Sequence, residues 1–180
     1  YARLLPWRAG LISADSFLED LNETAGRYYS NALIDTPNDQ IAGRFWEETL
    51  VRVLPYDRGS MYMAVVDEKI RKASGGKRSL DDIMQTLIDA KRAGVETTQE
   101  TWLELITAEL GPAAKTDFEA MLAGAVQRPS GGAFGPCFTG STATLRQFEL
   151  GFAGKSLTKP VRIVEGLVPG SAADKAGLRN

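Results

Sequence analysis

Apolar residues in the first two-thirds of the chain recur at the spacing of one face of an α-helix. The clearest run starts at Leu80, where apolar side chains fall at positions i, i+3, i+4, i+7 and i+8 through Ile88. Similar runs predict helices over residues 13–30, 36–50, 57–73, 97–110 and 118–125. Glycine and proline stand between most of these runs and mark the turns. The pattern therefore predicts a helical bundle.

Polar residues that can cap a helix precede several of these runs. Ser13 or Asp15 can cap the first long run, and residues 79–82 and 97–100 have the spacing of capping boxes. Pro55 is expected to break the chain between the second and third runs. Asp57 is then the expected cap of the helix that follows.

The pattern changes after Arg128. A cluster of proline, serine and glycine at 129–132 indicates a linker or turn. Apolar residues then alternate over 144–152 and recur in an extended run over 161–167, which favours β-strands, and a short helix is expected from Ser171. The predicted fold class is mainly α, a helical bundle followed by a partial β-rich module. We expect a helical domain over 1–128, a linker over 129–142 and the β-rich module over 143–180.

Composition removes several kinds of chemistry from these residues. The 180 residues include no His and one Cys, so they cannot hold a Ser-His-Asp triad, a Cys-His dyad, or a zinc site made of His or of several Cys. Lys and Arg total 21 and Asp and Glu total 23, a net charge of −2, whereas a nucleic-acid partner requires a basic face. No apolar run approaches the roughly 18 residues that span a bilayer. We expect no metal site, no nucleic-acid partner and no membrane span here.

The segment 54–59 is the candidate for catalytic chemistry in the helical part. Tyr56 stands just before a predicted helix and after Pro55, which fixes the approach of the chain. Gly59 falls in the first helical turn, where a glycine often lets a ligand or another backbone come close. The alternative interpretation of Tyr56 is a half-buried aromatic ring with its hydroxyl in water. Cys137 has no His to activate it, so we expect a small buried apolar residue rather than a nucleophile.

The C-terminal motif has the spacing of strand, loop, strand, turn and short helix. Its Leu150-Gly151-Phe152 loop can point backbone N–H groups at a peptide carboxylate, with a strand edge open to an added strand. The alternative is a β-hairpin with a tight glycine turn and a covered edge. Residues 148–178 resemble the first half of a PDZ domain, because the Leu-Gly-Phe loop and the run 168–178 match the family, with Ala172 where proline is usual. The resemblance implies that Leu150, Gly151 and Phe152 bind peptide C-termini.

The helical part resembles the C-terminal portion of the catalytic domain of the glycyl aminopeptidase family, zinc peptidases with an appended PDZ domain. The resemblance is carried by residues 56–59, 66–71 and 79–84. It implies that the zinc ligands lie upstream, in a longer parent chain that begins before Tyr1. The zinc would then belong to the parent, and the 180 residues alone would be inactive. The sequence leaves the compartment open; the resemblance points to a bacterial periplasm or cell envelope.

The run 55–59 also resembles the P-Y-x-K-G segment of the aminopeptidase N superfamily, with Arg58 in place of Lys. The resemblance implies that the Tyr56 hydroxyl donates a hydrogen bond to the oxyanion formed during peptide hydrolysis. The first hypothesis is therefore a zinc-dependent aminopeptidase that acts on peptide or protein substrates. The alternative is a non-catalytic peptide-binding scaffold with a helical docking domain. Half a PDZ domain would expose strand edges, through which copies of the chain could self-associate.

Overall fold

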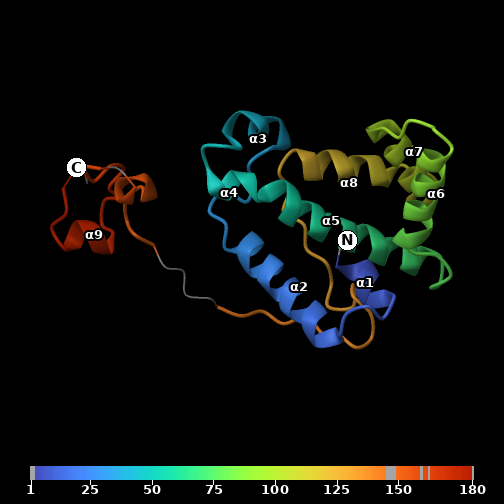
Figure 1. Cartoon of the computed structure of the whole chain (residues 1–180). Helices are drawn as coiled ribbons and strands as arrows, with labels where there is room; N and C mark the ends of the chain where they lie inside the picture. The colour runs from blue at the N-terminus through green and yellow to red at the C-terminus, as the bar shows by residue number, and fades with distance from the viewer. Residues whose placement is uncertain (1–2, 145–148, 159, 162, 180) are drawn as a thin grey trace. The chain divides into compact units, whose positions relative to one another are not determined.

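The computed structural model describes residues 3–144, 149–158, 160–161 and 163–179. The chain divides into two compact units, Tyr1–Ala143 and Thr144–Asn180. The first unit is helical, as Figure 1 shows, and its helices follow one another in this order: α1 (Leu4–Arg8), α2 (Ala14–Tyr29), α3 (Asn38–Arg44), α4 (Thr49–Arg52), α5 (Leu54–Ala73), α6 (Leu80–Arg92), α7 (Gln99–Leu110) and α8 (Ala113–Leu122). The helical bundle expected from the apolar spacing is thus confirmed.

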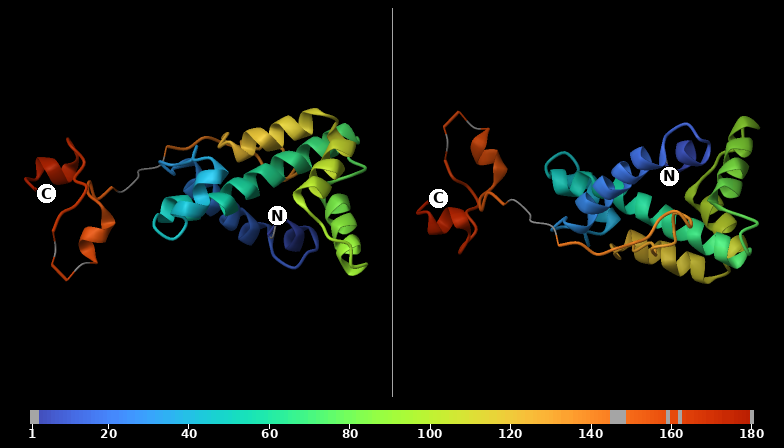
Figure 2. Two further views of the ribbon diagram at one scale, coloured as in Figure 1. Left: turned by 90° about the horizontal axis from the view of Figure 1, so that it is seen from above. Right: turned by 90° about the horizontal axis from the view of Figure 1, so that it is seen from below.

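Helix α5 is the central element of the helical unit. It runs between α2 and α8 in the views of Figure 1 and Figure 2. Its first half packs into a core with α2, α3 and α4, made of Tyr28, Ile41, Val51, Leu54 and Met61. Its second half packs into another core with α6, α7 and α8, which includes Tyr62, Ile70, Ile83, Ile106 and Phe118. Helix α5 therefore belongs to both cores, and packing in the first core holds its N-terminal end in place.

The helix starts show where local sequence signals succeed and where they fail. Ser79 caps α6 as expected, because its Oγ accepts from the backbone N–H of Asp81 at 3.2 Å and its own N–H donates to Asp82 Oδ2 at 2.8 Å. The cap of α7 is Thr98, one residue after Thr97, the first residue of the predicted capping box. Helix α5 begins at Leu54, so the predicted break at Pro55 and the Asp57 cap are wrong. A proline fits the first helical turn because its missing N–H is not needed there.

The segment that follows α8 lies against the helical unit. The Ser130 N–H donates to Glu68 Oε2 at 3.2 Å, and the carbonyl oxygen of Ala133 accepts from Arg71. The Phe134 ring lies 6.0 Å from the ring of Phe17. Residues 129–134 are therefore held to α2 and α5 by polar and aromatic contacts. None of the helices in the described residues is both long and apolar enough to cross a membrane.

The C-terminal unit corrects the predicted fold class. Its described residues contain no β-strand; they form η1 (Gly154–Leu157), α9 (Ala172–Lys175) and turns. Residues 145–148 of the first predicted strand and residue 162 of the second lie outside the described residues. Residues 149–158 and residues 163–179 form two segments of this unit. Backbone hydrogen bonds join the segments from Ala153 N to Glu165 O and from Val168 N to Gly151 O, each 2.8 Å.

Those two bonds join the segments without forming a regular ladder. A pair of strands is marginal unless a third strand or a packed helix supports it. The described residues supply no third strand, and the helix that packs on Gly151, α9, has only 4 residues. The prediction of a β-rich PDZ module is therefore wrong. The short helix expected from Ser171 is confirmed, because Ser171 Oγ accepts from the Asp174 N–H at 3.2 Å and caps α9.

Candidate functional site

Tyr56 lies in the first turn of α5, where α4 leads directly into it. Val53 is both the C-cap of α4 and the N-cap of α5, so the chain enters the long helix without a loop. The Tyr56 N–H donates to the Val53 carbonyl oxygen at 3.2 Å, and its side chain is 67% exposed. Among the described residues the Tyr56 hydroxyl has no hydrogen-bond partner. The phenol is therefore a free donor at the start of a well-anchored helix.

Asp57, the next residue, points inward and ties α5 to α2. Its side chain is 1% exposed and accepts two hydrogen bonds from Arg27, at 2.8 Å from Nε and 2.6 Å from Nη2. These hydrogen bonds raise the pKa of the Arg27 guanidinium, against a smaller opposing effect of burial. A bidentate pair fixes direction as well as distance. The residue after Tyr56 is thus locked to a neighbouring helix.

Arg58 is fully buried and anchors the turn before α3. Its Nη1 donates to Asn38 Oδ1 at 2.7 Å, and its Nη2 donates to the carbonyl oxygens of Ile34 at 2.7 Å and Thr36 at 2.8 Å. Both terminal nitrogens are therefore occupied by the chain itself, whereas Nε is buried with no hydrogen-bond partner among the described residues. In the P-Y-x-K-G comparison Arg58 stands where Lys is usual, and here its partners are structural.

Gly59 lies one turn after Tyr56 and so on the same helix face. A Cβ built on Gly59 would meet no atom of the described residues within 4 Å. Packing within this chain therefore does not require a glycine at this position. The space beside the Tyr56 side chain is open, which leaves room for a ligand or another backbone.

An exposed tryptophan precedes this helix and was missed by the sequence interpretation. Trp46 lies between α3 and α4 and is 83% exposed, with its ring 5.1 Å from that of Phe45 in an edge-on contact. The apolar spacing assigned both rings to one helical face. The structural reason is that α3 ends at Arg44 and α4 starts at Thr49, so both rings lie in the turn between the helices and not on a helical face.

A metal ion implied by the family resemblance does not fit the described residues. They contain no group of three or more His, Cys, Asp or Glu side chains that could hold a metal ion.

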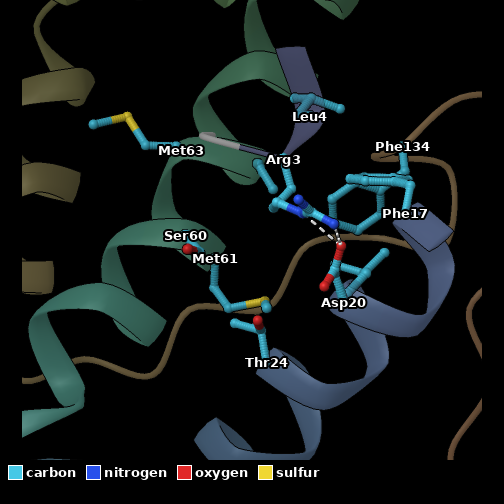
Figure 3. A pocket seen from close by; sticks show the side chains of 11 residues that line it. Arg3, Leu4, Phe17, Asp20, Thr24, Ser60, Met61, Met63 and Phe134 are labelled. Carbon is cyan, nitrogen blue, oxygen red and sulfur yellow. Dashed lines mark hydrogen bonds and ion pairs between the residues drawn. The ribbon is translucent and has the colours of Figure 1, made fainter. Parts of the chain in front are cut away.

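A separate apolar cavity lies between α1, α2, α5 and the segment around Phe134, with a volume of about 100 Å³. Figure 3 shows the Arg3 guanidinium reaching the Asp20 carboxylate beside the Phe17 and Phe134 rings, with the Met61 side chain deeper along α5. The walls are mostly apolar, which suits packing. Tyr56 does not line this cavity.

The predicted peptide-binding residues belong to the C-terminal unit. Gly151 is buried with φ +76°, and a Cβ there would lie 2.5 Å from the Oγ of Ser171. Leu150 and Phe152 on either side are half-buried. The glycine is needed because α9 packs directly on it; binding of a peptide C-terminus by these three residues stays a prediction.

Cys137 corrects a smaller expectation, because its side chain is exposed rather than buried. Its neighbour Phe138 packs edge-on against Trp7 at 5.0 Å and Phe17 at 5.6 Å. The aromatic ring takes the inward position, and the thiol next to it faces water.

In comparisons with known proteins, no family model and no curated protein matches this chain.

Proposed function

We propose that this chain is the helical part of the catalytic domain of a zinc-dependent aminopeptidase, in which Tyr56 stabilises the oxyanion. The observation that supports the proposal is the contrast between three consecutive residues. Tyr56 is 67% exposed, whereas Asp57 and Arg58 are 1% and 0% exposed. The two buried charged side chains hold the start of the helix in place, and the phenol of Tyr56 stays exposed.

Peptide hydrolysis creates negative charge on the carbonyl oxygen when water adds to the scissile bond. A phenol carries its proton at neutral pH and can donate a hydrogen bond to that charge. Such a donor accelerates the reaction because it meets the charge only as it develops, without rearranging. One donor of this kind accounts for about 10²–10³ in kcat.

The contacts around Tyr56 support a preorganised donor. Arg27 holds Asp57 from one side, and the Arg58 guanidinium holds residues 34–38 from the other. The backbone at Tyr56 is thus fixed by neighbours in sequence, and only the side-chain torsions of the tyrosine remain free. Open space beside Gly59 supports the approach of a peptide backbone to this face.

The remaining catalytic groups would come from the parent chain. The described residues do not form a zinc site, and the sequence has no His to act as a base. We therefore expect the 180 residues alone to hydrolyse no peptide. If the parent also hydrolyses none, the alternative of a non-catalytic scaffold with a helical docking domain takes its place.

The experiment is a kinetic comparison in the full-length parent. Tyr56→Phe should lower kcat by about 10²–10³ and leave KM nearly unchanged, because the lost hydrogen bond exists only in the transition state. Tyr29→Phe is the matched control: Tyr29 is 40% exposed and its hydroxyl donates to the Gln127 carbonyl oxygen at 2.8 Å. It should leave kcat unchanged. An unaltered kcat in Tyr56→Phe would remove this residue from the mechanism.

A further inference from the structure

A second cavity, which we call the Tyr62 cavity, lies in the helical unit between α5, α7 and α8. Its volume is about 180 Å³. Most of its lining is apolar, with contributions from Val65, Val66, Ile106, Leu110 and Ala114. An engineered apolar cavity of about 150 Å³ is large enough to bind benzene. The Tyr62 cavity therefore has room for a ring or a branched aliphatic group.

Tyr62 gives this cavity an unused polar group. Its side chain lines the cavity and is 2% exposed, and its hydroxyl has no hydrogen-bond partner among the described residues. Leaving a buried hydroxyl unpaired destabilises the folded state, so nearly all such groups in folded proteins have a partner. A partner that this chain does not itself supply is the simplest reason for the arrangement.

Trp102 packs beside Tyr62 but does not itself line the cavity. Its Nε1 is also without a partner among the described residues, and its ring lies 6.4 Å from the Tyr62 ring, edge-on. Burial raises the pKa of Tyr62 to about 12, an effect that the nearby indole N–H opposes and the Asp117 carboxylate reinforces. The phenol thus keeps its proton across the physiological range. The cavity offers one donor, the Tyr62 O–H, and needs an acceptor.

The charged residues of the lining select against a charged ligand. Lys69 Nζ lies 2.5 Å from Asp117 Oδ2, and both side chains are about half exposed, at 46% and 48%. The charges of Lys69 and Asp117 compensate each other, and both side chains are partly exposed to solvent. A bound anion would lie near the Asp117 carboxylate, and a bound cation would gain nothing from the Tyr62 O–H donor. The complementary ligand is therefore neutral.

We propose that the Tyr62 cavity binds a small neutral molecule that has an aromatic or branched aliphatic body and one hydrogen-bond-accepting oxygen. The oxygen of the ligand accepts a hydrogen bond from the Tyr62 O–H, and its apolar body packs against the apolar wall of the cavity. Binding is non-covalent and is independent of the proposed role of Tyr56, so the two proposals can fail separately.

The test is a pair of titrations of the 180-residue chain, followed by the indole N–H signals in nitrogen–proton NMR spectra. The probes are acetophenone and isopropylbenzene, which have nearly the same shape but differ in the accepting oxygen. Acetophenone should bind saturably and shift the signal of Trp102, identified by its loss in Trp102→Phe. The signals of Trp7 and Trp46 should stay in place.

Two variants decide between the hydrogen bond and simple apolar binding. Tyr62→Phe should weaken acetophenone binding about three- to tenfold, the value of one net hydrogen bond, and leave isopropylbenzene binding unchanged. Ala120→Leu, which fills the cavity from α8, should abolish binding of both probes. Ala113→Leu is its control, since Ala113 is an exposed residue of α8 outside the cavity lining.

Three results would overturn the proposal. One is the absence of saturable binding of acetophenone, which would show that the cavity holds water alone. Another is an equal effect of Tyr62→Phe on both probes. The third is a shift of the Trp46 signal instead of the Trp102 signal, because Trp46 is 83% exposed and would report contact with the surface.

Discussion

Arg27 of α2 donates two hydrogen bonds to Asp57 of α5, at 2.8 and 2.6 Å, and this pair joins the two helices beside Tyr56. The same guanidinium also lies 3.5 Å from Glu23, one helical turn away. Asp57 is 1% exposed and Glu23 is 72% exposed. One arginine therefore has a buried partner and an exposed one, which allows the two kinds of ion pair to be compared directly.

Removing the buried partner should cost far more stability than removing the exposed one. We expect Asp57→Asn to lower the free energy of unfolding by about 1–3 kcal/mol, less than for a fully buried pair because Arg27 is 42% exposed. Glu23→Gln should change it by less than about 0.5 kcal/mol. Urea denaturation of the two variants measures both values. Equal losses would contradict the anchoring role of Asp57.

Stability should fall in acid because of Asp67, which is fully buried on α5. Burial alone would raise the pKa of Asp67, but hydrogen bonds from Arg8, from the Leu80 N–H and from Arg71 outweigh it and hold the pKa below the ordinary value. The folded state thus binds this proton less readily than the unfolded state. The contribution of Asp67 is complete above the unfolded pKa of about 3.9 and is lost as the pH falls through the folded value.

Asp67→Asn isolates this contribution. The variant should be less stable than the natural chain at pH 7, because Arg8 and Arg71 lose their buried partner. The difference should shrink as the pH is lowered from about 5 to 3. Denaturation curves across that range measure it. Two stability profiles that stay parallel down to pH 3 would show that Asp67 is not the group responsible.

Gly151 provides a test of packing in the C-terminal unit. A Cβ there would lie 2.5 Å from Ser171 Oγ and 3.1 Å from Ala173 Cβ, and the backbone has φ +76°. We expect Gly151→Ala to cost about 1–3 kcal/mol through strain and displacement of the α9 cap. Hydrogen exchange at the Asp174 N–H should speed up accordingly. Gly154→Ala, where a Cβ meets nothing within 4 Å, is the control and should leave exchange unchanged.

Local features of the fold could be predicted from the sequence, and long-range ones could not. The Ser79 cap lies within three residues of its partners, so its pattern is visible in the chain. Asp57 looked like a helix cap because its true partner, Arg27, is 30 residues away. Arg58 likewise meets acceptors 20 to 24 residues earlier. No short window contains such contacts.

The predicted strands failed for the same physical reason. Alternation of apolar residues shows that a segment can form a strand, but a sheet exists only where another segment completes its hydrogen bonds. In the C-terminal unit the backbone hydrogen bonds at Ala153 and Val168 join the two segments, and side chains supply further contacts, such as the bond from the Glu165 N–H to Ser156 Oγ. At the candidate site, the sequence placed Tyr56 just before a helix, whereas the residue lies inside the first turn of α5, because the helix begins at Leu54 and accommodates Pro55. The exposure of Tyr56 was not predictable either, since it depends on Asp57 and Arg58 turning inward.

The central claim is that the Tyr56 hydroxyl meets the charge of the transition state, and a phosphinic peptide inhibitor tests it most directly. Such an inhibitor carries a charged oxygen where the tetrahedral intermediate would carry it. In the full-length parent, Tyr56→Phe should weaken this inhibitor by the same factor by which it lowers kcat/KM, about 10²–10³. A competitive inhibitor that lacks this oxygen should bind both forms equally. If the phosphinic peptide binds the variant and the natural enzyme equally well, Tyr56 is not the oxyanion donor.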